Sequence, residues 1–135
     1  MQGRFFLDTN ILLYGYSSFD AYKQLISREL MQYEVCAVST QVLQEFCNVA
    51  HRKLRKAFPE VRVALKELAE NIYIHRNSFQ TIELACTIAH RYGFSFYDSM
   101  IVAAAEECGC GVVYSEDMQH EQKVNSVKII NPFKR

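Results

Sequence analysis

The sequence lacks the segments by which proteins enter or cross membranes. None of its apolar runs approaches the roughly 20 residues that span a bilayer. Its first residues show no basic segment followed by a long apolar stretch and a small-residue cleavage site, so they do not resemble a signal peptide. Repeats, low-complexity tracts and linkers are missing as well. From these absences we expect a cytoplasmic protein that has no contact with the membrane.

The cysteines lack the pairing that structural sites need. The chain has five of them, an odd number, and none belongs to a Cys-x-x-Cys pair. Cys108 and Cys110 flank a single glycine, but a zinc site would need further ligands at matching spacing. We therefore expect reduced and buried thiols, which is the usual state in the cytoplasm.

The composition is that of an ordinary globular protein with no excess charge. Half of the 135 residues are hydrophobic and 22% are charged, which predicts one domain over residues 1–135 with a core of its own. Fifteen basic residues balance fifteen acidic ones, so net charge neither favours nor excludes a nucleic-acid partner.

Basic residues nevertheless gather in one part of the chain, between positions 51 and 66. The cluster consists of Arg52, Lys53, Arg55, Lys56, Arg62 and Lys66. Glu60 is the one acid among them. Such a cluster suits contacts with phosphates, although a solvated helix face has the same composition.

Short apolar segments alternate with helical patterns along the chain. Strands are expected at residues 4–7, 35–38, 72–74, 111–114 and 127–130. Helices are expected at residues 11–16, 20–33, 40–54, 60–71, 78–92 and 97–108, with a break at Pro59. This alternation predicts an α/β fold, a three-layer α/β/α sandwich around a short, mainly parallel sheet.

Four acidic residues occupy positions that this fold brings to one edge of the sheet. Asp8 ends the first strand, and Asp117 follows the strand at 111–114. Glu45 lies in the second turn of the helix after the second strand, and Asp98 lies in the first turn of its helix. Ligands of open parallel sheets bind beyond the carboxyl ends of the strands, which is where these acids should meet.

Each acid also has a purely structural explanation. Asp8, or Asn10 after it, would cap the following helix. Asp98 would complete a capping box at the start of its helix. Glu45 would be an exposed acid on the flank of an apolar stripe, and Asp117 an ordinary turn residue. Taken singly, none of the four indicates a functional site.

Taken together, the four carboxylates favour a metal site. Several negative charges in one small space would raise each other's pKa values until some carboxyl groups took up protons. Oxygen ligands without His or Cys suit Mg²⁺ or Mn²⁺, which would keep the acids ionised. A cation there would also explain why Asp8 interrupts the apolar segment RFFLDTNILLY. We therefore expect a site for one or two divalent ions.

Four segments in this order resemble the PIN-domain nucleases, and among them the VapC-like toxins of toxin–antitoxin pairs. The segments are FLDTNILLY, STQVLQEF, FYDSMIVAAA and VVYSEDMQ, which extend over nearly the whole chain. By this resemblance Asp8, Glu45, Asp98 and Asp117 match the family's acidic quartet and would be both catalytic residues and metal ligands.

The resemblance also implies supporting residues at the site. Thr9 or Ser115 would supply a hydroxyl group, and Asn10 a hydrogen bond that steadies the acids. Some relatives carry another acid after the fourth one, whereas His120 stands three positions after Asp117 here. The number of ions, one or two, therefore stays open.

The activity that the resemblance implies is metal-dependent cleavage of RNA. Family members share a small α/β/α sandwich, use Mg²⁺ or Mn²⁺ and usually form dimers, and the toxins are held inactive by an antitoxin. We expect an endoribonuclease toxin with RNA as substrate, a cognate antitoxin and a homodimeric state. Water-driven hydrolysis would leave a 5′-phosphate and a 3′-hydroxyl. A stand-alone RNA-processing nuclease and a non-catalytic binding module are the alternatives.

The basic cluster and several tyrosines are the candidates for contacts with RNA. The predicted phosphate contacts are Arg52, Lys53, Arg55 and Lys56. Tyr14, Tyr16 and Tyr97 are candidates for stacking on unpaired bases, although packing against the core is the better explanation of them.

Overall fold

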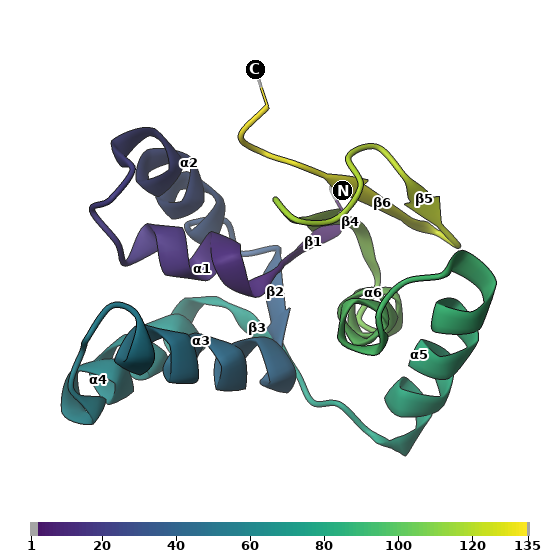
Figure 1. The fold of residues 1–135 in the computed structure, drawn as a ribbon, viewed down its shortest axis with the longest axis horizontal. Coiled ribbons are helices and arrows are strands. Elements are labelled where there is room, and N and C mark those ends of the chain that lie inside the picture. The colour runs from purple at the N-terminus through teal and green to yellow at the C-terminus, as the bar shows by residue number, and fades with distance from the viewer. Residues whose placement is uncertain (1–2, 135) are drawn as a thin grey trace.

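A six-stranded sheet in the order β3-β2-β1-β4-β6-β5 runs through the molecule (Figure 1). The computed structural model describes residues 3–134. The strands are β1 (Arg4–Leu7), β2 (Cys36–Ser39), β3 (Tyr73–His75), β4 (Cys110–Tyr114), β5 (Lys123–Val124) and β6 (Val127–Ile130). Every neighbouring pair is parallel except β5 and β6, which run antiparallel. The mainly parallel sheet predicted from the sequence is therefore confirmed.

Six helices cover the two faces of this sheet. They are α1 (Thr9–Gly15), α2 (Ala21–Met31), α3 (Thr40–Arg52), α4 (Phe58–Asn71), α5 (Phe79–Tyr92) and α6 (Phe96–Glu107). Helices α1 to α4 lie on one side of the sheet, and α5 and α6 lie on the other (Figure 1). This arrangement confirms the predicted three-layer α/β/α sandwich.

Side-chain caps explain why most helices begin where they do. Ser39 accepts a hydrogen bond from the amide of Val42 at the start of α3, as the sequence predicted for one of two candidates. Helix α4 begins at Phe58, two residues before the predicted start, because a proline is tolerated in the first turn of a helix. Pro59 is thus part of α4 and does not separate two elements.

Three further details differ from the sequence-based expectation. Helix α3 ends at Arg52, so Leu54 lies in the following turn and not on the helix. Strand β5 was not predicted, because two residues show no periodicity, and the adjacent Asn125 adopts a φ of 54° in the turn that leads to β6. All five cysteines are free thiols, but Cys86 is exposed where a buried residue was expected.

The parallel pairing brings three strand ends to one edge of the sheet. Leu7, the last residue of β1, pairs with Tyr114, the last residue of β4, and β2 runs parallel to β1 on the other side. Helix α6 packs closely on the sheet through Val102 and the alanines after it, which are fully buried.

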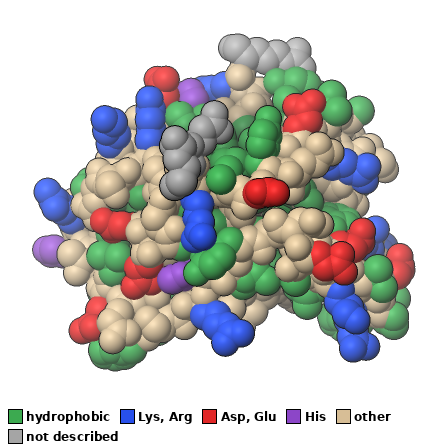
Figure 2. All heavy atoms as spheres, turned by 180° about the vertical axis from the view of Figure 1, so that it is seen from behind, with side chains coloured by type: hydrophobic (Ala, Val, Ile, Leu, Met, Phe, Trp, Pro, Cys, Tyr) green, Lys and Arg blue, Asp and Glu red, His purple; other side chains and the backbone are tan. Residues whose placement is uncertain are grey.

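Neither sign of charge dominates the face seen in Figure 2. Basic and acidic side chains are interspersed there with hydrophobic ones (Figure 2), in keeping with a net charge of zero. None of the helices within residues 3–134 is long and apolar enough to cross a membrane.

Candidate active site

Asp8 is held at the sheet edge by groups from the end of β4 and from α1. Its backbone amide donates to the Tyr114 carbonyl at 3.0 Å. Its Oδ1 accepts from the Thr9 amide at 2.7 Å, which makes Asp8 the N-cap of α1, and its Oδ2 accepts from the Ser115 hydroxyl at 2.8 Å. The capping role considered from the sequence is therefore real, and it leaves the second oxygen directed at the end of β4.

The environment of Asp8 disfavours its negative charge. Burial raises the pKa of this carboxyl group from 3.8 to about 6, and the nearby charges of Asp98 and Glu45 act in the same direction. The hydrogen bonds from Ser115 and Thr9 oppose this rise in pKa. Three of the four acids therefore lie within electrostatic range of one another.

Glu45 is oriented by donors from α1 and from its own helix. Thr9 Oγ1 donates to Glu45 Oε2 at 3.2 Å, and Gln41 Nε2 donates to Oε1 at 2.7 Å. Gln41 also lies 3.4 Å from the carbonyl of Tyr97, the residue before Asp98. The sequence reasoning missed Gln41, although its position four residues before Glu45 places both on one helix face.

Asp98 lies in the first turn of α6, where the capping box expected as an alternative forms only in part. The Ser95 hydroxyl accepts from the Asp98 amide at 3.2 Å. Among residues 3–134 the structure shows no return bond from the Ser95 amide to the Asp98 carboxylate. Capping therefore accounts for Ser95 and does not account for the carboxylate of Asp98.

Asp117 is joined to the other acids through α1. The Asn10 side-chain amide donates to Asp117 Oδ2. Next to it, Glu116 accepts from the Tyr14 hydroxyl and forms an ion pair with Lys23 of α2. The turn after β4 is thus fixed to α1 and α2 at three points, of which the sequence reasoning anticipated the one made by Asn10.

The donor set fits a hard divalent cation in its chemistry. All four candidate ligands are carboxylates, and one of them has a raised pKa that a nearby cation would lower. Within residues 3–134, however, no three Asp, Glu, His or Cys side chains form a group that could hold an ion as they stand. The convergence expected from the sequence is therefore partial.

Two adjoining cavities lead away from the acids. The first has a volume of about 350 Å³ and is lined by Asn10, Leu13, Tyr14, Ser17, Phe19, Val49, Lys53, Leu54, Glu116 and Asp117. The second, of about 440 Å³, is lined by Tyr16, Ser17, Ser18, Phe19, Lys53, Leu54, Arg55 and Lys56. Three of the four basic residues predicted to contact RNA therefore line these cavities, whereas Arg52 lies exposed at the end of α3.

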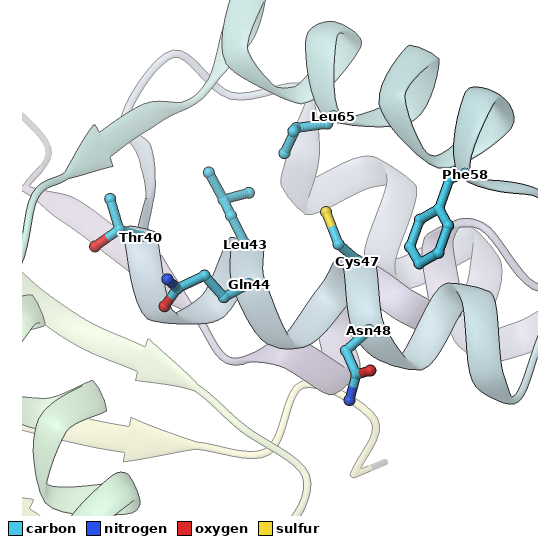
Figure 3. Close-up of a pocket in the computed structure, with 7 residues that line it drawn as sticks. All are labelled: Thr40, Leu43, Gln44, Cys47, Asn48, Phe58 and Leu65. Carbon is cyan, nitrogen blue, oxygen red and sulfur yellow. The ribbon is translucent and has the colours of Figure 1, made fainter.

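A third and more apolar cavity lies between α3 and α4 (Figure 3). Its volume is about 540 Å³, and its lining residues are Thr40, Leu43, Gln44, Cys47, Asn48, Phe58 and Leu65. The Phe58 ring also stacks on His51, with ring centroids 3.9 Å apart.

Comparisons with known proteins agree with this fold. Solved structures with the same fold include VapC20 of Mycobacterium tuberculosis, a sarcin–ricin loop cleaving toxin, with a TM-score of 0.67, 19% identity and coverage of 84% of this chain and 89% of that one. A toxin–antitoxin complex from Klebsiella pneumoniae gives a TM-score of 0.72 and 17% identity, covering 96% of this chain and 98% of that one.

VapBC2 of Rickettsia felis, bound to a DNA fragment from its promoter, gives a TM-score of 0.65 and 15% identity, with coverage of 93% and 96%. At such identities the likeness is one of fold. No curated protein matches the sequence. The family model of the PIN domain matches residues 5–124, and the chain therefore belongs to the PIN domain family.

Proposed function

We propose that this protein is a metal-dependent endoribonuclease and the toxin of a toxin–antitoxin pair. The observation that carries the proposal is Asp8, a partly buried carboxylate placed beside Asp98 and Glu45 at the carboxyl edge of the sheet. Membership of the PIN domain family supports it. A structural relative that is an RNA-loop-cleaving toxin and others in toxin–antitoxin complexes support the toxin role.

Asp8, Asp98 and Asp117 would hold Mg²⁺ or Mn²⁺, as one ion or two, and Glu45 would be a further ligand or would orient the attacking water. The cation would lower the pKa of a bound water and offset the charge that develops on the phosphate. The chain keeps the acids in place through short bonds across elements: Ser115 holds Asp8, and Thr9 holds Glu45. Asn10 does the same for Asp117.

RNA would reach the acids along the two cavities described above. Lys53, Arg55 and Lys56 would contact its phosphates there, and Arg52 would do so from the exposed end of α3. Hydrolysis by water would leave a 5′-phosphate and a 3′-hydroxyl. The protein would act in the cytoplasm as a homodimer with a cognate antitoxin.

Cleavage of a structured RNA pool by the purified protein tests the proposal. The reactions contain Mg²⁺, Mn²⁺ or EDTA, and compare the wild type with Asp98→Asn. Asp20→Asn is the matched control, because Asp20 caps α2 outside the acidic cluster and asparagine caps as well as aspartate. We expect metal-dependent cuts with 5′-phosphate ends that Asp98→Asn loses and Asp20→Asn keeps. Equal cleavage by Asp98→Asn, or cyclic phosphate ends, would refute the mechanism.

A further inference from the structure

The two cavities beside the acids form one groove. They share Ser17, Phe19, Lys53 and Leu54 as lining residues. One end of the groove is lined by Asn10 and Asp117, and the other by Arg55 and Lys56. Its walls are the loop between α1 and α2 and the segment that follows α3. The groove therefore connects Asp117, one of the four candidate acids, with the basic cluster.

Phe19 lies on the first wall of the groove, the loop between α1 and α2, and its aromatic side chain is open to solvent. It is 95% exposed and lines both cavities. Its amide donates to the Ser17 hydroxyl at 3.3 Å, which helps to fix the loop that carries it. An apolar ring kept in water beside a charged groove has a free face on which a planar group can stack.

The tyrosines considered from the sequence are less well placed for stacking. Tyr14 bonds to Glu116, and Tyr16 packs edge-on against the buried Phe46 with ring centroids 5.3 Å apart. Tyr97 is exposed but does not line the groove. Phe19 is therefore the aromatic residue best placed to contact a ligand there.

The second wall holds its cations in a fixed and conformationally unfavourable turn. Arg55 adopts a φ of 57°, the left-handed region that a residue with a Cβ rarely occupies. The Lys56 amide donates to the Ala50 carbonyl at 3.2 Å. The Lys56 carbonyl lies 2.9 Å from His51 Nδ1. The charged side chains of the second cavity are Lys53, Arg55 and Lys56, all basic, which suits a polyanion.

We propose that this groove binds an unpaired stretch of RNA, with one base stacked on Phe19 and the neighbouring phosphates on Lys53, Arg55 and Lys56. Bases in a duplex have both faces covered by their neighbours, so only an unpaired base can offer a face to Phe19. The first cavity, at about 350 Å³, lies within the usual range of small-ligand sites. This inference rests on the proposed function and adds Phe19 as a residue that recognises one base of the RNA substrate.

Binding measured without cleavage tests the inference. Fluorescence anisotropy of a labelled 12-nucleotide single-stranded RNA, and of the same RNA in a duplex, is recorded with proteins that all carry Asp98→Asn. Adding Phe19→Ala should weaken single-strand binding roughly tenfold or more, the usual effect of losing one stacked base. Phe79→Ala, which removes a 70% exposed phenylalanine of α5 outside the groove, is the matched control and should change nothing.

Arg55→Asn tests the second wall, because asparagine tolerates the left-handed conformation and lacks the positively charged guanidinium group. It should lower the slope of log affinity against log salt by about one, whereas Phe19→Ala should leave that slope unchanged. Thermal melting equal to that of the parent excludes misfolding. An unchanged affinity in Phe19→Ala, an equal loss in Phe79→Ala, or duplex binding as tight as single-strand binding would overturn the inference.

The outcomes are separable from those of the cleavage assay. If RNA binding depends on Phe19 but the protein does not cleave RNA, the proposal for the groove stands and the nuclease proposal is wrong. If the protein cleaves RNA in a metal-dependent way but Phe19→Ala binds RNA as tightly as its parent, the nuclease proposal stands and the proposal for the groove is wrong.

Discussion

Replacement of Asp8 by asparagine should stabilise the metal-free protein at neutral pH. Burial, with the charges of Asp98 and Glu45, raises the pKa of Asp8 from 3.8 to about 6. As pH rises between these two values, the unfolded chain loses the Asp8 proton before the folded chain does. Unfolding then releases a proton, so the contribution of Asp8 to the free energy of unfolding falls as pH rises through this window. Above pH 6 the raised pKa of Asp8 lowers the free energy of unfolding by about 3 kcal/mol, since one pKa unit corresponds to about 1.36 kcal/mol.

Asparagine removes this destabilisation and keeps the local contacts. It caps helices as well as aspartate does, and its Oδ1 can accept from the Thr9 amide. The Ser115 hydroxyl can turn to accept from the new amide group. Asp8→Asn should therefore raise the free energy of unfolding at pH 7.5 by up to about 3 kcal/mol, or Tm by up to roughly 10 °C. At pH 4 the gain should nearly vanish.

Thermal melts followed by circular dichroism from pH 4 to pH 8 in EDTA provide the measurement. Asp20→Asn, which changes the capping carboxylate of α2 outside the candidate site, serves as control and should not raise Tm at pH 7.5. Mg²⁺ or Mn²⁺ should then raise the Tm of the wild type and not that of Asp8→Asn. The reasoning is refuted if Asp8→Asn lowers Tm at pH 7.5 as much as at pH 4, because the cost of the buried charge would then be absent.

Two further predictions concern the contacts that hold the turn after β4. Ser115→Ala removes the buried donor to Asp8, so the pKa of Asp8 should rise further and the free energy of unfolding should fall by about 1–2 kcal/mol. Carboxyl-carbon NMR measures the pKa, and urea denaturation measures the free energy of unfolding. An unchanged pKa would contradict the role of Ser115. Glu116→Gln removes the charge that pairs with Lys23, so urea denaturation should show a loss of about 1 kcal/mol that shrinks in high salt, whereas the exposed Glu29→Gln should show none.

The sequence predicted best those features that leave a local pattern. The buried strands and the helix after Ser39 followed from apolar runs and capping residues. Strand β5, with two residues, is too short to show a period. The sequence placed the start of α4 two residues too late, because a proline can stand just before a helix or in its first turn.

The candidate acids were predictable because each adjoins a strand end or a helix start, but their partners were not. The Lys23–Glu116 ion pair joins residues 93 positions apart, and no local spacing marks such a pair. Phe19 was overlooked because it lies in a short loop, where one aromatic residue forms no pattern. Side-chain contacts across the sheet edge depend on the register of the strands, which only the folded structure supplies.

The order of strands has a consequence for how the protein is synthesised. β1 emerges first from the ribosome but lies in the middle of the sheet, between β2 and the much later β4. The bond from Ser115 to Asp8 and the bond from Asn10 to Asp117 each join residues 107 positions apart. A nascent chain therefore lacks the assembled site until residue 117 has been added. An enzyme with the proposed activity would be produced beside messenger and ribosomal RNA while still unable to cut either.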